Sequence, residues 1–291
     1  MIHQTYKSDE KNIKLLKNKC DFDYEMNDNF CTKISFFKET EVFESTLRKN
    51  NKKQEIIQII SKFPKLKYLN LRKSKIKYIP EFLSKELEYI DISCNDLQEF
   101  PVWILKQNSL KYLNVGANLI RSIPDISHLQ IEYLKLHKNK LKYIPNINKT
   151  CKSLNLYLNT EIKCFKNIEN LHNIENFCFG VSNICKMPTI LCWPKLKWLT
   201  ITVTEIEEID NQICLLKNLI GLQLAKNKIK NLPKNFGELN IEHLTLFSNQ
   251  ITNLPNSFYN LKLTRLNLSK NNLKCINKII NKFKNIKFLK V

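Results

Sequence analysis

The stretch "LKYLNLRKSKIKYIP", Leu66 to Pro80, carries the spacing of apolar residues that decides the fold. Leucine or isoleucine stands at positions 1, 4, 6, 11 and 14 of this stretch, and a proline closes it. The spacing matches neither the period of two of a strand nor the 3.6 of a helix. It recurs along the chain at intervals of 20 to 23 residues, in copies that begin at Leu87, Leu110, Ile131, Cys151, Ile174, Leu196, Leu219, Ile241, Leu263 and Ile286. A period of this length predicts a solenoid, because one repeat cannot bury its apolar face alone.

The repeat reads L-x-x-L-x-L-x-x-N-x-I-x-x-I-P, and each part of it has a structural meaning. The segment x-L-x-L-x has a period of two and predicts a short strand whose leucines point inward. The ninth position holds Asn in seven of ten repeats and Ser or Thr in the others, which predicts a polar side chain that satisfies backbone groups in a buried turn. After the prolines, "EFLSKE", "VWILKQN" and "NSFYN" predict one or two helical turns. Repeat five has lost its proline and shifted one apolar residue, which predicts a bulge or kink.

These features resemble the leucine-rich repeat family, and the Ile-Pro or Leu-Pro after the Asn turn is most similar to its intracellular Ras-suppressor and Scribble-like class. The resemblance covers residues 66–291. It implies an α/β fold, a right-handed and curved solenoid with a parallel β-sheet on the concave face and short helical or irregular segments on the convex face. It also implies a role in protein–protein interaction. We expect an N-terminal capping region at residues 1–53 and a leucine-rich repeat domain at residues 54–291, with ten full repeats and a terminal partial repeat.

The two ends leave alternatives open. Residues 54–66 predict a helical lead-in to the first repeat, residues 11–19 a short helix and residues 32–39 a strand. The favoured interpretation is a cap over the first repeat, which solenoids require, and the alternative is a recruitment module of an adaptor, for example of the ubiquitin-ligase type. The partial repeat at the C-terminus leaves a strand edge, so oligomerisation through that edge is a further possibility.

Composition narrows the classes of function. The net charge is +20, and nine Lys or Arg but no acid follow Glu242. Binding of anionic surfaces or nucleic acid through the basic turns is therefore a second alternative, although charges are sparse in the expected concave columns. We see no secretory signal, no apolar run of about 20 residues and no C-x-x-C spacing. The sequence thus predicts a cytoplasmic protein with free, buried thiols and no metal or cofactor, and without a catalytic motif we expect no enzyme.

The third, fifth and seventh residues of each repeat are expected on the concave face. Tyrosines fill the third position in the first four repeats, and Tyr and Trp dominate many protein interfaces. The alternative is that these rings only stack between adjacent strands, which contributes about 0.2–1 kcal/mol per pair. We favour the interface, with a protein partner that contacts Tyr68, Tyr89, Asp91, Tyr112, Tyr133, Lys135, His137, Tyr157, Trp198, His243, Phe247 and Arg265. The second position alternates between Lys and Glu, which predicts salt links between repeats.

Overall fold

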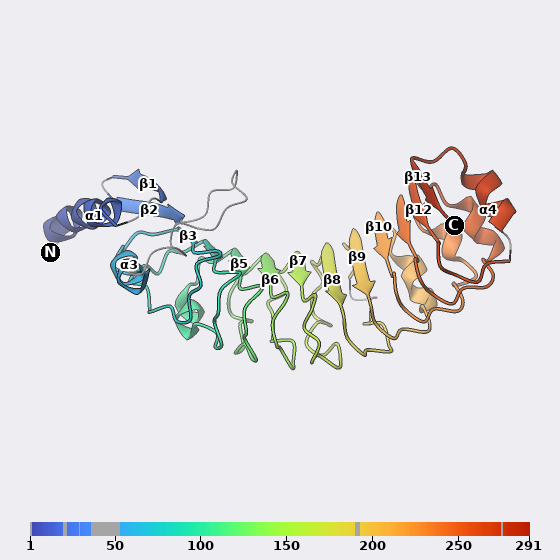
Figure 1. The fold of residues 1–291 in the computed structure, drawn as a ribbon, viewed down its shortest axis with the longest axis horizontal. Helices are drawn as coiled ribbons and strands as arrows, with labels where there is room; N and C mark the ends of the chain where they lie inside the picture. The colour runs from blue at the N-terminus through green and yellow to red at the C-terminus, as the bar shows by residue number, and fades with distance from the viewer. Residues whose placement is uncertain (1, 20–21, 29, 36–52, 190–192, 275) are drawn as a thin grey trace. The chain divides into compact units, whose positions relative to one another are not determined.

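A computed structural model describes residues 2–19, 22–28, 30–35, 53–189, 193–274 and 276–291 (Figure 1). The chain divides into two compact units. Unit 1 comprises residues 1–140 and 145–148, and unit 2 comprises residues 141–144 and 149–291.

Unit 1 is built on strands that follow one another in chain order. Its helices are α1 (Ile2–Lys17) and α3 (Lys53–Ile60), with a short 3-10 helix η1 (Val102–Lys106). Its strands are β1 (Asp23–Asn27), β2 (Phe30–Ser35), β3 (Tyr68–Asn70), β4 (Tyr89–Asp91), β5 (Tyr112–Asn114) and β6 (Tyr133–Lys135). The first pair is an antiparallel hairpin, and every later neighbour pairs in parallel. Parallel pairing of successive strands is the arrangement that the repeat predicted.

Unit 2 continues the same plan. Its strands are β7 (Ser153–Asn155), β8 (Asn176–Gly180), β9 (Trp198–Thr202), β10 (Gly221–Gln223), β11 (His243–Thr245), β12 (Arg265–Asn267) and β13 (Phe288–Lys290). All of them pair in parallel with their neighbours in the unit. Between them lie the 3-10 helices η3 (Asn211–Leu215), η4 (Phe236–Glu238) and η5 (Asn256–Asn260), and α4 (Ile276–Phe283) precedes β13.

The repeat pattern accounts for this architecture position by position. Each of the eleven strands from β3 to β13 begins at the third residue of its repeat. The apolar residues point to the interior, as in the first repeat, where Leu66, Leu69 and Leu71 are all 0% exposed. The eighth residue of all ten full repeats has a positive φ, from 52° at Ala117 to 62° at Val181, and this left-handed residue turns the chain off the strand.

The ninth-position Asn has the predicted role and a further one. Asn118 donates through Nδ2 to the carbonyl of Val115 in its own repeat and to that of Ile92 in the preceding repeat. Its Oδ1 accepts from the backbone N–H of Leu97, also in the preceding repeat. The same contacts recur at Asn95, Asn139, Asn249 and Asn271. Each Asn therefore ties two repeats together while it satisfies buried backbone groups.

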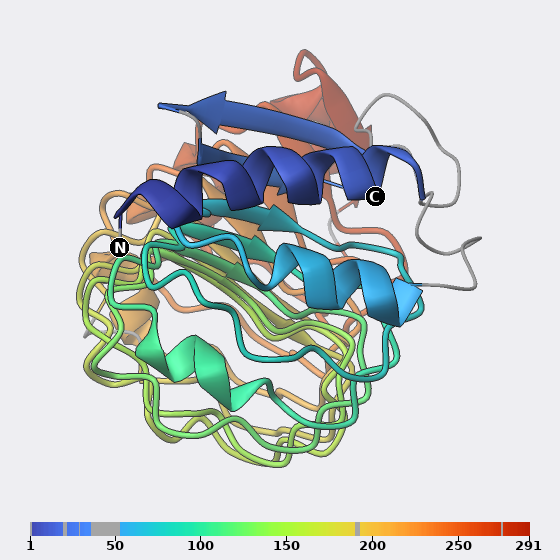
Figure 2. The same cartoon turned by 90° about the vertical axis from the view of Figure 1, so that its left-hand side faces the viewer.

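The N-terminal elements lie against the first repeat of unit 1 (Figure 2). Strand β2 pairs in parallel with β3, with Ile34 opposite Leu69. The helices α1 and α3 bury the apolar side chains of Leu16, Ile56 and Ile57. The backbone N–H of Cys31 donates to the carboxylate of Asp9, which joins β2 to α1. The predicted helix at residues 11–19 is thus the end of a longer helix, and residues 36–39 of the predicted strand lie outside the described residues.

Other expectations have mixed outcomes. Helical turns form at "VWILKQN" and "NSFYN", but residues 81–86 are not helical, so that prediction was wrong. The bulge expected in repeat five is not present in the β7–β8 pairing, which keeps its register, and the shifted Ile162 is still buried. Salt links between repeats are confirmed for Lys67–Glu88 at 3.5 Å and Lys197–Glu175 at 2.8 Å.

Candidate functional site

The third, fifth and seventh residues of the repeats line one side of the strands, which we call the strand face. They alternate with the buried leucines, as the period of two requires. In unit 1 this face carries Tyr68, Tyr89, Tyr112 and Tyr133, the third residues of the first four repeats. The first three rings are partly buried and the fourth is 44% exposed. The tyrosines thus lie outside the core, on the surface where they were predicted.

Three of these tyrosines form a continuous stack. The rings of Tyr68 and Tyr89 lie 4.2 Å apart at 9°, and those of Tyr89 and Tyr112 lie 4.2 Å apart at 6°. Parallel pairing of β3, β4 and β5 places the three side chains directly opposite one another. Stacking between strands, the alternative in the sequence analysis, is therefore present. The three side chains nevertheless stay partly exposed.

Two lysines close the ends of the stack. The Nζ of Lys33, on β2, lies 5.2 Å from the centroid of the Tyr68 ring. The Nζ of Lys135, on β6, lies 5.3 Å from the centroid of the Tyr112 ring. A cation over an aromatic face is attracted by the ring quadrupole. Burial raises the pKa of the Tyr89 phenol far above its usual value, with smaller contributions from Tyr112 and Asp91, so the middle ring stays neutral.

The fifth residues of unit 1 correct one expectation. Asn70 and Asp91 are each 4% exposed and Asn114 is 5% exposed, so these three residues offer little surface to a partner, whereas Lys135 in the same column is partly exposed. Asp91 accepts hydrogen bonds from the backbone N–H and the hydroxyl of Ser93 and from Nδ2 of Asn114. Asp91 therefore holds the turn after β4 in place. Its carboxylate already accepts three hydrogen bonds from neighbouring residues.

His137 takes up space that a glycine leaves open. A Cβ added to Gly116 would lie 2.3 Å from Cε1 of His137, so the imidazole lies across this glycine. The Nδ1 atom of His137 is buried and has no hydrogen-bond partner among the described residues. Burial lowers the pKa of His137, and the nearby Lys138 and Lys135 lower it further. Burial over Gly116 thus favours the neutral form of the His137 ring.

The strand face of unit 2 has a different form because Gly221 interrupts the third column. A Cβ on Gly221 would lie 2.1 Å from the Trp198 ring, so the indole lies across β10. There it stacks on His243 of β11 at 5.3 Å and 24°. The two rings form one wall of a hollow of about 560 Å³, whose lining also includes Gln223, Thr245, Asn267, Arg265 and Phe288. Three predicted residues, Trp198, His243 and Arg265, are therefore brought together at one site.

The hollow carries a positive group without a local counter-ion. Arg265 is exposed and forms no ion pair within the described parts of the chain. The lining contains no Asp or Glu. Phe288 is 41% exposed, and Lys290 lies 5.6 Å from its ring centroid. The hollow therefore combines aromatic walls with an unpaired guanidinium, groups that recognise carboxylates and planar apolar groups.

The remaining predicted residues of unit 2 lie elsewhere on its strand face. Tyr157 lies against Gly180 of the next strand, where an added Cβ would be 2.8 Å from its ring. Phe247 is partly buried, and Lys270 Nζ lies 5.3 Å from its ring centroid. Neither residue lines the hollow.

Comparison with solved structures identifies the fold. A leucine-rich repeat protein of Leptospira interrogans matches with a TM-score of 0.75 and 29% identity, over 79% of this chain and 62% of that chain. The internalin InlF of Listeria monocytogenes matches with a TM-score of 0.61 and 21% identity, over 81% and 75%. The leucine-rich repeat domain of APL1B matches with a TM-score of 0.62 and 18% identity, over 75% of this chain and 65% of that chain. The chain has the fold of leucine-rich repeat proteins. No family model and no curated protein matches the sequence.

The fold is thus the α/β leucine-rich repeat solenoid that the sequence predicted. The expected Ras-suppressor and Scribble-like class stays a prediction. The chain spans 62% of the length of the Leptospira protein, so the activities of that whole protein do not transfer to it.

Three further features are metal ligands, membrane-spanning helices and cysteine thiols. In the described ranges, no group of three or more His, Cys, Asp or Glu side chains is placed to hold a metal ion. The same ranges contain no helix with the length and apolar character needed to cross a membrane. Burial raises the pKa of Cys31 and Cys151 to about 12, so these thiols are unreactive at neutral pH. Cys164 and Cys185 are exposed, which corrects the expectation of buried thiols at those two positions.

Sequence reasoning missed several contributors to the hollow. Its lining includes four residues that were placed in the outward columns but were not selected as partner-binding residues, namely Gln223, Thr245, Asn267 and Phe288. The role of Gly221, which leaves room for the Trp198 ring, was also missed. The useful signal was the glycine itself. A glycine in a strand interior often marks a place where a neighbouring group approaches closely, and Gly116 and Gly221 are both covered by a ring.

Proposed function

We propose that this leucine-rich repeat protein binds another protein through its strand face and has no catalytic role. The observation that carries the proposal is the placement of aromatic residues on this face while the leucines fill the core. The tyrosine stack of unit 1 offers rigid rings that lose little entropy on binding. The hollow of unit 2 adds Trp198, Phe288 and an unpaired Arg265, and Trp, Phe and Arg are residue types that are enriched at protein interfaces.

A carboxylate of the partner is the natural counter-ion for Arg265. The guanidinium forms charge-assisted, often bidentate hydrogen bonds with carboxylates. Nine Lys or Arg residues and no Asp or Glu follow Glu242 in the sequence, so the local field of unit 2 attracts negative charge. We therefore expect association to slow as the salt concentration rises.

The test is capture of the partner from the cell of origin by variants that keep the fold. Tyr133→Ala removes a ring that is 44% exposed, and Arg265→Ala removes the unpaired charge. Tyr143, 76% exposed and in the same repeat as Tyr133 but off the strand face, provides the matched control in Tyr143→Ala. We expect a protein that wild type and Tyr143→Ala retain and that both strand-face variants lose. Equal capture by all four proteins contradicts the proposal.

For the N-terminal segment we propose a cap. Pairing of β2 with β3 and burial of Ile34 and Leu16 support this role over that of an adaptor module. Deletion of residues 1–42 removes β2 and exposes the edge of β3, which invites pairing between chains. We expect this truncated protein to aggregate. A soluble monomer that still binds the partner supports the adaptor instead.

The anion-binding alternative relies on the basic turns. Two of its lysines are already neutralised, because Lys228 lies 2.9 Å from Glu205 and Lys230 lies 2.8 Å from Glu207. This alternative predicts heparin or nucleic-acid affinity that falls steeply with salt. Salt-insensitive or absent binding to heparin favours the protein partner.

A further inference from the structure

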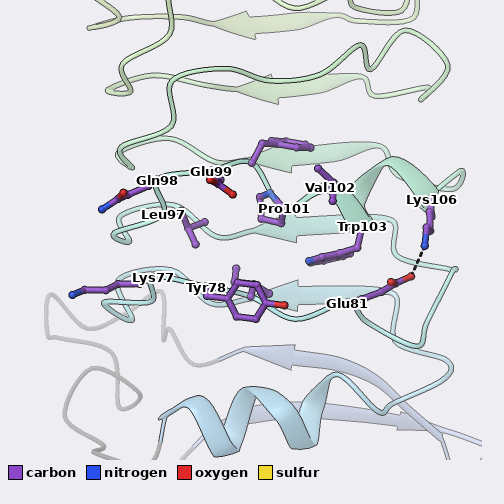
Figure 3. Close-up of a pocket in the computed structure, with 12 residues that line it drawn as sticks. Lys77, Tyr78, Glu81, Leu97, Gln98, Glu99, Pro101, Val102, Trp103 and Lys106 are labelled. Atoms are coloured by element: carbon purple, nitrogen blue, oxygen red, sulfur yellow. Dashed lines mark hydrogen bonds and ion pairs between the residues drawn. The ribbon is translucent and has the colours of Figure 1, made fainter.

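A cleft lies away from the strand face of unit 1, between the segments that follow β3 and β4 (Figure 3). It has a volume of about 460 Å³ and is lined by residues of 77–81 and 97–106. Unit 2 has clefts at the equivalent place between its repeats, lined by Glu207, Glu208 and Asp210. The repeat geometry thus produces a groove at this position, and the side chains decide what it can hold. In unit 1 these include Tyr78, Val102 and Trp103.

Trp103 has an unsatisfied hydrogen-bond donor in the wall of this cleft. The side chain is 5% exposed and packs on Phe82 with ring centroids 5.0 Å apart. Its Nε1 is buried and has no hydrogen-bond partner in the part of the chain that the structure describes. In Figure 3 the nitrogen end of the indole faces Tyr78 and Pro101, while Lys106 and Glu81 lie at the other end. By contrast, buried Trp193 donates its Nε1–H to the carbonyl of Ile168 at 3.2 Å.

The remaining lining favours an uncharged occupant. Glu81 accepts from Lys106 at 2.9 Å and from Lys85 at 3.0 Å, and these two lysines lower its pKa. Lys77 and Glu99 have opposite charges, so the cleft has no net charge to attract an ion. Tyr78 and Val102 are each 64% exposed and present apolar surface at the rim. An apolar group beside a hydrogen-bond acceptor matches this lining, whereas a charged group would lose its hydration without gaining a counter-ion.

We propose that this cleft binds an uncharged, apolar residue of a partner polypeptide, with a main-chain carbonyl of that segment accepting from Trp103 Nε1. A polypeptide places a carbonyl next to each side chain, so it supplies both groups that the cleft lacks. The volume of the cleft suits one residue with its flanking peptide groups. The site shares no residue with the strand face, so it stands or falls independently of the function proposed above.

N-acetyl-leucinamide, one apolar residue between two peptide groups, is the probe that tests this site. The chain has three tryptophans, so a ¹⁵N-labelled sample gives three indole N–H signals, and Trp103→Phe assigns the relevant one. We expect a saturable downfield shift of the Trp103 indole proton with a Kd of about 1–10 mM, as befits so small a ligand. The Trp193 signal should stay fixed because its proton is already bonded. A fixed Trp198 signal would show that the strand face is not involved.

Matched probes and variants define the specificity. N-acetyl-glycinamide keeps the carbonyls without the side chain, and the N-acetyl amides of glutamate and lysine add charge. We expect each to bind about fivefold or more weakly, in line with loss of an apolar contact or with uncompensated desolvation. Val102→Ser, at an exposed rim position, should weaken N-acetyl-leucinamide about threefold without unfolding the protein. An unshifted Trp103 signal, or equal shifts with the glycine or charged probes, overturns the proposal.

Discussion

The strand faces of the two units show how one repeat template makes two kinds of surface. In unit 1, tyrosines at the third position stack at 4.2 Å, and the adjacent fifth-position residues are almost fully buried. In unit 2, Gly221 breaks the column, Trp198 lies across the gap, and a hollow of about 560 Å³ opens beside it. The backbone pairing is parallel and in register in both places. The third column of residues therefore decides whether the strand face carries a hollow or the flat stack of Tyr68, Tyr89 and Tyr112, which we call the plate.

The two surfaces also differ in what they contribute to stability. Each ring of the plate contacts a ring on the neighbouring strand, so the plate stabilises the unit that displays it. Arg265 and Phe288 of the hollow are exposed and leave room between them and the Trp198 wall. We infer that substitutions in the plate change stability as well as binding, whereas substitutions of Arg265 and Phe288 mainly change binding.

The largest effect is expected for Tyr89→Ala. Tyr89 is the middle ring of the stack, so its removal leaves both neighbours without a partner and creates a gap in the plate. We expect the free energy of unfolding to fall by about 2–4 kcal/mol, in the range of large aromatic truncations. Urea denaturation followed by circular dichroism measures the change.

Tyr133→Ala is the matched control for that experiment. Tyr133 occupies the same column, but it is 44% exposed and its ring stacks on no other ring in the described residues. Its loss should change the free energy of unfolding by about 0.5 kcal/mol or less. If both alanine variants lose the same stability, the stack is not a structural element and the contrast between the two faces disappears.

The fold could be predicted from the sequence because its signals are local and periodic. The leucines at positions 1, 4 and 6 fixed where each strand begins, and the Asn at position 9 fixed the turn. The left-handed eighth residue was not predicted, since Lys73, Ala117 and Val203 share no side-chain property. The solenoid imposes that conformation on whichever residue stands there. Burial of Asp91 was also missed, because its hydrogen bonds with Ser93 in the following turn and Asn114 on the next strand are contacts that the sequence pattern does not show.

The candidate site could be predicted only in part from the sequence. The alternation of a strand placed Tyr89, Trp198 and Arg265 outward, and these placements hold in the structure. Whether neighbouring rings would stack or leave a hollow depends on rotamers and on contacts between repeats, which a column of letters does not contain. The cleft at Trp103 was not predicted at all. Trp103 is a buried residue, and only coordinates show that its nitrogen lacks a partner.

The second prediction concerns Gly221→Ala, which places a methyl group where the Trp198 ring lies. In Gly221→Ala the new methyl group would lie 2.1 Å from the Trp198 ring, so the ring must leave its place on His243. We expect a loss of about 1–3 kcal/mol in the free energy of unfolding, typical of overpacking. The tryptophan emission should also shift as the environment of Trp198 changes.

Gln223→Ala, two residues along the same strand and facing the same hollow, is the control for that substitution. It removes atoms without creating a clash, so the Trp198 emission should match that of wild type. An unchanged spectrum in Gly221→Ala would mean that Trp198 does not lie across β10.

The third prediction uses pH to test the burial of His137. Burial, Lys138, Lys135 and Arg72 lower the pKa of His137, while Asp91 acts in the opposite direction. The folded state therefore binds its proton at lower pH than the unfolded chain, whose His has a pKa of about 6.5. Stability from this residue is fully present above that value and is lost as the pH falls toward the pKa of the folded state.

His137→Phe keeps a ring over Gly116 but cannot take up a proton. Between pH 7.5 and 5, wild type should lose more stability than this variant. Urea denaturation at both pH values measures the difference. A parallel decline in the two proteins would show that His137 is solvated and titrates as it does in the unfolded chain.

The smallest effect concerns the charge of the hollow. Trp103 and Trp193 are 5% and 0% exposed, so collisional quenching of the fluorescence reports chiefly on Trp198. Arg265 lines the same hollow and has no counter-ion among the described residues, so it should concentrate iodide near the indole. We expect the iodide quenching constant of Arg265→Ala to be about half that of wild type at low salt. Acrylamide, which is neutral, should quench both proteins alike. A drop for both quenchers would indicate that the substitution closed the hollow. Arg265 would then contribute to the hollow by keeping it open, and not through its charge.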